Sequence, residues 1–165
     1  MLDLGSGGGY PGLPLAVALP ASRALLVESV GKKAAFLETV VAATGLGARV
    51  GVAVARAESL AADPRHRGRW AAVTSRAVGS VADAAELAFP LLRTDGCAIT
   101  WKRLPVDAEL EAAERAVDGL GGGTIDVVPT RVRGLEDHVL VMATKQGATP
   151  RGYPRDPAER RRRPW

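Results

Sequence analysis

The sequence is poor in cysteine and histidine and lacks long apolar runs, and each shortage excludes a class of protein. The single thiol, Cys97, cannot form an internal disulfide, and a zinc site built on cysteines would need several. The two histidines lie far apart, so no metal site is assigned. No stretch approaches the roughly 20 apolar residues of a membrane span, and no basic leader precedes the apolar start. We therefore expect a cytoplasmic protein without a membrane segment.

Charge is unevenly distributed along the 165 residues, whose 47% apolar content is typical of one globular domain. Residues 1–150 carry 16 basic and 16 acidic side chains, whereas residues 151–165 carry six arginines against two acids. We therefore divide the chain into a neutral domain, residues 1–150, and a basic tail, residues 151–165. Such a tail suits a polyanion through phosphate contacts. A solvated, disordered end is the alternative.

Apolar runs alternate with helical patterns along nearly the whole chain, which predicts an α/β fold with a mostly parallel sheet between helices. Ser29 is expected to cap the second helix and Gly45 to follow its end. The predicted strands are Leu2–Leu4, Ala24–Glu28, Val50–Ala55, Trp70–Ser75, Cys97–Lys102, Thr124–Val128 and His138–Thr144. The predicted helices are Leu13–Leu19, Lys32–Thr44, Ala57–Ala62, Val81–Leu92 and Asp107–Val117.

A glycine-rich turn follows the first strand and opens the first helix, in the segment Asp3–Gly12. Glycine lets the backbone approach a ligand closely, and the following helix supplies free amide donors. Gly7, Gly9 and Gly12 fit G-x-G-x-x-G, so a nicotinamide-dependent oxidoreductase competes for this motif.

Carboxylates at the ends of successive strands favour a different cofactor. Asp3 would repel a pyrophosphate but would suit the cationic S-adenosylmethionine, which class I methyltransferases receive at a D-x-G-x-G-x-G turn. Glu28 ends the second strand, where a carboxylate accepts both ribose hydroxyls of either cofactor. Ala57 and Glu58 follow the third strand, where the adenine is usually met. Glu58 is also simply a first-turn acid that the helix dipole favours.

The residues after the fourth strand limit the atom that could be methylated. Thr74-Ser75-Arg76-Ala77 replaces the N-P-P-Y-like tetrad of enzymes that methylate exocyclic amines. Cys97 lies within an apolar strand, which indicates an inert core thiol rather than a nucleophile. A ring nitrogen with a free lone pair, such as guanine N7, needs neither that tetrad nor a nucleophilic cysteine, because positioning beside the methyl group suffices.

Several cations are candidates for ligand or RNA contacts. Arg76 ends a strand at the edge of the expected site, where it would face a ligand or pair with Asp3 or Glu58. Lys32 and Lys33 occupy the first turn of a helix, the end that repels cations, which favours a phosphate contact. The tail adds Arg155, Arg160, Arg161, Arg162 and Arg163 as expected RNA-binding residues.

Taken together, these segments resemble the bacterial 16S ribosomal RNA guanine-N7 methyltransferases, the glucose-inhibited division protein B family. The similarity is collinear over nearly the whole chain. It is carried by Asp3–Pro14, by Leu26–Leu37, by Ala55–Glu58, by Thr74–Ala77 and by Gly152–Arg155 in the tail.

The resemblance implies a class I methyltransferase fold, S-adenosylmethionine as cofactor, and 16S ribosomal RNA or the small ribosomal subunit as partner of a monomer. By position it implies that Gly5, Tyr10, Ala57, Glu58 and Arg76 bind the cofactor. Asp3, Glu28, Gly7 and Gly9 are further expected contacts. No acid or base is assigned, and Arg76 is the candidate for positioning the reaction.

Two departures from the family pattern stand out. Family members begin with a helical segment that is not found before Leu2 here, and a Lys-Gly pair of the family is replaced by Lys102-Arg103. We therefore expect lowered stability and an exposed sheet face. A catalytically silent RNA-binding relative stays open beside the methyltransferase and the oxidoreductase.

Overall fold

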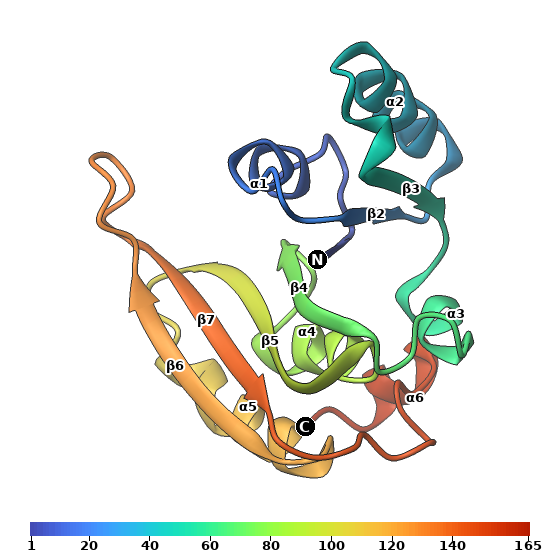
Figure 1. The fold of residues 1–165 in the computed structure, drawn as a ribbon. Coiled ribbons are helices and arrows are strands. Elements are labelled where there is room, and N and C mark those ends of the chain that lie inside the picture. Colours follow the sequence, from blue (N-terminus) through green and yellow to red (C-terminus); the bar gives the residue numbers. More distant parts are fainter.

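A seven-stranded sheet runs through the computed structural model, which describes residues 1–165 (Figure 1). Its strands are β1 (Leu2–Leu4), β2 (Ala24–Glu28), β3 (Val50–Val54), β4 (Trp70–Arg76), β5 (Leu92–Arg103), β6 (Gly123–Pro129) and β7 (His138–Lys145). They are ordered β3-β2-β1-β4-β5-β7-β6. Strands β1 to β5 pair in parallel, and β7 is antiparallel to both β5 and β6. The expected mostly parallel sheet with an antiparallel last strand is confirmed.

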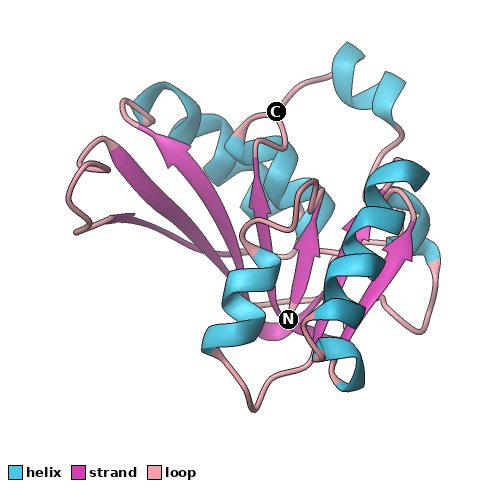
Figure 2. Ribbon diagram, turned by 90° about the horizontal axis from the view of Figure 1, so that it is seen from above, coloured by secondary structure: helices cyan, strands magenta, loops and turns pink.

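Helices cover both faces of the sheet (Figure 2). They are α1 (Gly12–Ala18), α2 (Gly31–Ala43), α3 (Ala57–Ala62), α4 (Val81–Ala88), α5 (Asp107–Gly119) and α6 (Pro157–Arg162), with a short 3-10 turn η1 (Leu46–Ala48). The larger core joins β1, β4 and β5 to α3, α4 and α5. A smaller core joins β2 and β3 to α1 and α2. No helix has the length and apolar character needed to cross a membrane.

The three residues of β1 alternate between the two faces of the sheet. Leu2 and Leu4 point into the larger core, so Asp3 points to the side of α1. All three are buried although the strand is short. Because β1 pairs with β2 on one side and β4 on the other, it lies where the chain reverses its direction across the sheet. In open α/β sheets, ligands bind at the carboxyl ends of the strands at this point.

Some predicted boundaries are wrong, and local chemistry explains them. The helix expected over Val81–Leu92 ends at Ala88, because Pro90 cannot continue it, and the buried Leu92 instead begins β5. Ser29 does not cap α2, whose cap is Val30. The Val30 amide donates a hydrogen bond to the carboxylate of Glu28, at 2.9 Å. Gly45, with φ of +69°, follows the end of α2 as expected.

The last fifteen residues pack against the domain rather than extending from it. Helix α6 lies beside α3 in Figure 1. Arg155 places its guanidinium on the fully buried carboxylate of Glu86 in α4, with its closest contact at 2.5 Å. The Trp165 indole donates to the same carboxylate at 2.6 Å and stacks on Tyr153. The basic segment is therefore held by a buried acid of the domain.

Candidate functional site

The glycine turn between β1 and α1 is shaped for a close approach. Gly5, Gly7 and Gly9 have φ of +68°, +55° and +93°, a region that residues with side chains rarely occupy. The amides of Gly5 and Ser6 donate to the carbonyl of Val27 and tie the turn to β2. A Cβ on Gly12 would overlap Leu26 and lie 2.6 Å from Asp3 Oδ2. The turn therefore requires glycine at positions 5, 7 and 9 for conformation and at position 12 for packing.

Glu28 is fixed beside this turn by two backbone donors. Its Oε2 accepts from the Gly7 amide at 3.0 Å and its Oε1 from the Val30 amide at 2.9 Å. Burial alone would raise the pKa of Glu28, but these amides and the charge of Lys33 outweigh burial and lower it. The side chain is thus a preorganised carboxylate, and each oxygen keeps a lone pair for a hydroxyl group.

Asp3 is the most deeply buried acid of the turn, with 1% of its surface exposed. Its Oδ2 accepts from the Gly12 amide at 3.1 Å, and its Oδ1 is buried without a partner. Burial raises the pKa of Asp3 to about 6, although the nearby Ser6 hydroxyl, the Gly12 amide and the charge of Arg76 lower it. A buried carboxylate with an unpaired oxygen fits a cationic ligand group that would supply the missing donor.

A cavity of about 210 Å³ opens beside the turn. Predicted residues Gly5, Ala57 and Glu58 line it, together with Leu4, Val27, Ser29, Ala55, Arg56, Val78, Leu87 and Arg160. Apolar walls with a few polar groups are typical of a site for a flat, mostly apolar ligand such as adenine. Arg160 of α6 forms part of the wall and pairs with Glu58, its Nη2 lying 2.6 Å from Oε1. The segment expected as a basic tail therefore closes one side of this cavity.

Arg76 and Tyr10 form a second group at the same edge of the sheet. The Arg76 guanidinium lies over the Tyr10 ring, 5.6 Å from its centre, and Tyr10 is 57% exposed. Arg76 pairs with neither Asp3 nor Glu58; it lines a separate cavity of about 360 Å³ with Trp101 and His138. The predicted cofactor residues thus divide between two adjoining places, with Asp3 between them.

The residues predicted to bind RNA have different surroundings. Lys32 and Lys33 are exposed at the start of α2, and Arg161, Arg162 and Arg163 are exposed on α6 or just after it. Arg155 and Arg160 are instead engaged by Glu86 and Glu58. Two of the five tail arginines expected to bind RNA are therefore paired within the chain, because buried or half-buried carboxylates attract them, and RNA binding by the five stays a prediction.

Sequence reasoning missed the role of Glu86 and the apolar walls Val78 and Leu87 of the first cavity. A single carboxylate inside the apolar run Ala84–Ala88 was the available signal, because a buried acid requires a partner. That partner, Arg155, lies 69 positions away, and no local pattern identifies it.

The sheet order, the glycine turn and the carboxylate after β2 define the fold class as that of the class I, Rossmann-like methyltransferases. Solved structures agree. The citrinin polyketide synthase CMeT domain matches with a TM-score of 0.67 at 13% identity, covering 90% of this chain and 46% of that one. A structure described as a predicted O-methyltransferase from Agrobacterium tumefaciens matches with a TM-score of 0.66 at 22% identity, covering 87% and 72%.

The chain belongs to the GidB family, described as rRNA small subunit methyltransferase G, whose family model matches residues 1–132. It is 43% identical over 164 residues to ribosomal RNA small subunit methyltransferase G of Roseiflexus sp. (strain RS-1), covering 99% of this chain and 70% of that protein. The corresponding protein of Deinococcus radiodurans is 40% identical, covering 93% and 61%. The chain thus spans between 61% and 70% of the length of these relatives.

Family membership confirms the family and the methyltransferase class that the sequence motifs predicted. Family and fold together support S-adenosylmethionine as the cofactor, and the family's description names small-subunit ribosomal RNA as what its members methylate. The nicotinamide-dependent oxidoreductase and the silent RNA-binding relative are not favoured. The buried, partnerless Asp3 oxygen and the crowded glycine turn are consistent with that cofactor.

Proposed function

We propose that this chain transfers a methyl group from S-adenosylmethionine to N7 of a guanine in 16S ribosomal RNA, acting as a cytoplasmic monomer. The observation that carries the proposal is the pair of fixed carboxylates, Asp3 and Glu28, on either side of the glycine turn. One has an unpaired oxygen for a cation and the other has lone pairs for two hydroxyl groups. An adenosine with a cationic amino acid attached requires this combination.

Each group of the site has a part in holding the cofactor. Glu28 would accept the ribose hydroxyls, Glu58 and the backbone of Ala57 would meet the adenine in the first cavity, and Asp3 would face the α-amino group. Gly5, Gly7 and Gly9 would let the ligand lie against bare backbone. Tyr10 and Arg76 would bound the site on the side where the acceptor enters. When bound, the cofactor supplies a methyl group carried on a sulfonium.

The reaction requires little acid–base chemistry from the protein. The lone pair of guanine N7 forms the new N–C bond while the C–S bond breaks and leaves its electron pair on sulfur. No proton leaves the attacking nitrogen, so positioning and exclusion of water are the tasks of the chain. This agrees with a site whose carboxylates are engaged by backbone amides and where Arg76 is the nearest candidate for orienting the acceptor.

The remaining exposed cations are suited to RNA phosphates. Ser29 and Arg160 line the first cavity; Lys32 and Lys33 follow Ser29 at the start of α2, and Arg161 and Arg162 follow Arg160 in α6. Phosphate contacts from these two segments would hold the RNA near the cofactor.

The test is transfer of labelled methyl from S-adenosylmethionine to small subunits that lack base methylation. We expect label in 16S RNA at a guanine that becomes sensitive to reduction and aniline cleavage, the reactivity of an N7-methylated base. A full-length relative serves as the positive control. Label on a guanine without that sensitivity would contradict the N7 assignment, and no label from a folded, cofactor-binding chain would contradict the activity.

A further inference from the structure

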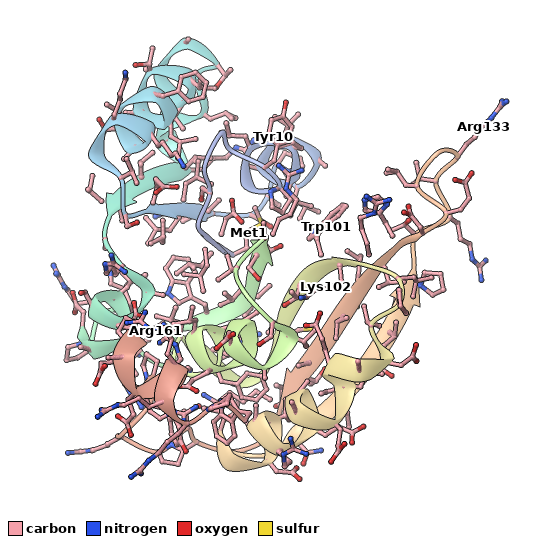
Figure 3. The ribbon with its side chains drawn as sticks, turned by 180° about the vertical axis from the view of Figure 1, so that it is seen from behind. Met1, Tyr10, Trp101, Lys102, Arg133 and Arg161 are labelled. Carbon is pink, nitrogen blue, oxygen red and sulfur yellow. The ribbon has the colours of Figure 1, made fainter.

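A second cavity, of about 360 Å³, lies across Arg76 from the glycine turn. It is formed where β4 and β5 end and β7 begins, and Leu135 of the β6–β7 connection closes one side. In Figure 3, Trp101 lies between Tyr10 and the hairpin that carries Arg133 at its tip. Arg76 and Trp101 are register partners on adjacent parallel strands, so their side chains project to the same face.

The charges around this cavity are mostly neutralised within the protein. Lys102 Nζ lies 2.8 Å from Glu109, and Arg103 pairs with Asp137, which also holds the His138 Nδ1 atom at 2.8 Å. Arg76 has no carboxylate partner and instead lies over Tyr10. The cavity thus presents one half-buried indole and one free guanidinium to a ligand.

These features match the needs of a nucleobase taken out of an RNA strand. Enzymes that act on a base bind it between aromatic or apolar side chains, and RNA bases stack on indoles and guanidinium planes. A base that gains a methyl group at N7 also gains a positive charge. The face of an indole attracts such a charge, whereas an aliphatic wall does not. Trp101 offers the indole face of this cavity, and the smaller His138 ring beside it is held by Asp137.

We infer that the cavity beside Arg76 is the acceptor-base site and that Trp101 is the platform on which the guanine stacks, with Arg76 between the base and the cofactor. This inference rests on the proposed function. It assigns the specificity of that function to one side chain that makes no contact with the first cavity. Trp101 therefore binds both the neutral guanine and, more tightly, the cationic N7-methylated product.

The first experiment observes the indole N–H resonances of the three tryptophans by NMR in the full 165-residue chain saturated with S-adenosylhomocysteine. Trp70 and Trp165 are internal controls, because Trp70 stacks on His66 and Trp165 donates to Glu86. Millimolar 7-methylguanosine monophosphate is expected to shift the Trp101 resonance and leave the other two unchanged. Trp101→Ala identifies the resonance.

Three outcomes are distinguished. A shift confined to Trp101 supports the inference, together with calorimetric affinity for 7-methylguanosine monophosphate that is about tenfold weaker in Trp101→Ala and partly restored in Trp101→Phe. An unshifted Trp101, or equal binding by Trp101→Ala, overturns it while S-adenosylhomocysteine binding still upholds the cofactor site. A chain that does not bind S-adenosylhomocysteine overturns the proposed function and the inference with it. Unchanged S-adenosylhomocysteine affinity in Trp101→Ala shows that the variant is folded.

Discussion

Arg160 and Glu58 join the end of the chain to the cavity beside the glycine turn, because the guanidinium of α6 lies 2.6 Å from the carboxylate that follows β3. Both side chains are largely shielded from water, and Arg160 also donates to the carbonyl of Arg155 at 2.7 Å. The same arginine lines a neighbouring cavity of about 380 Å³ between α4 and α6. The C-terminal segment is therefore a structural part of the cavity where we propose that the adenosine binds.

Removing this arginine should weaken cofactor binding without unfolding the domain. In Arg160→Ala, Glu58 loses its charged partner and the cavity loses one wall, so we expect affinity for S-adenosylhomocysteine to fall about three- to tenfold. Isothermal titration calorimetry measures the change. The matched control is Arg162→Ala, which removes an exposed arginine from the same helix. Equal affinities of the two variants would show that the pair does not support the site.

Separating Arg155 from Glu86 should affect stability instead. Arg155→Ala leaves a fully buried carboxylate without its guanidinium partner, which costs about 3 kcal/mol or more of the free energy of unfolding. Urea denaturation monitored by circular dichroism measures this. Adding Glu86→Gln to Arg155→Ala should recover part of the loss, because it removes the unpaired charge.

The exposed Arg163 provides the comparison for this effect, since Arg163→Ala should unfold at the midpoint of the original chain. Deletion of residues 151–165 should destabilise at least as much as Arg155→Ala, so lost RNA binding by the deleted chain would not by itself assign an RNA contact. A deleted chain that unfolds at the original midpoint would refute the structural role of this segment.

Sequence patterns predicted the local features of this molecule and missed the long-range ones. The alternation of apolar runs and helices predicted the α/β sheet, and the glycine motif predicted a tight turn with Asp3 and Glu28 beside it, where we propose that the cofactor binds. The docking of the tail was missed, because an ion pair between Glu86 and Arg155 leaves no periodic signal. The end of α4 was misplaced for a local reason, since Pro90 outweighed the apolar pattern that continues to Leu92.

Asp3 should make cofactor affinity depend on pH. Burial raises the pKa of Asp3 to about 6 in the free chain, and an adjacent ammonium group would lower it, so binding favours the carboxylate form. Affinity for S-adenosylhomocysteine is therefore expected to rise about tenfold from pH 5 to pH 7 and then level off. Titrations across this range, in buffers of different ionisation enthalpy, should also detect proton release near pH 6.

Asp3→Asn is the control for that titration, and it should also change how the free energy of unfolding depends on pH. Because the folded pKa of Asp3 lies above the unfolded value, the folded chain binds more protons between about pH 4 and pH 6, and its free energy of unfolding falls as pH rises through this window. Asp3→Asn should remove this fall and flatten the affinity profile. A pH dependence of affinity that survives in Asp3→Asn would assign it to another group.

Two neighbouring glycines should respond differently to alanine. A Cβ on Gly12 would overlap Leu26 and crowd the Asp3 carboxylate, whereas a Cβ on Gly8 would meet no atom within 4 Å. Gly12→Ala is expected to destabilise the domain by roughly 1–3 kcal/mol and to abolish cofactor binding, since the turn must shift. Gly8→Ala should change stability little. Thermal unfolding and calorimetry of the two variants test this, and equal effects would contradict the packing described for the turn.

Calorimetric titration with S-adenosylhomocysteine tests the proposed cofactor site most directly. It compares the 165-residue chain with Glu28→Ala and with the exposed control Glu38→Ala. Glu28 holds the glycine turn through the Gly7 amide and offers its remaining lone pairs to the ribose. We expect micromolar binding by the original chain and by Glu38→Ala, and a loss of at least tenfold in Glu28→Ala. A cooperatively folded chain that does not bind S-adenosylhomocysteine, or a Glu28→Ala variant that binds it unchanged, would show that the cofactor does not bind at this turn.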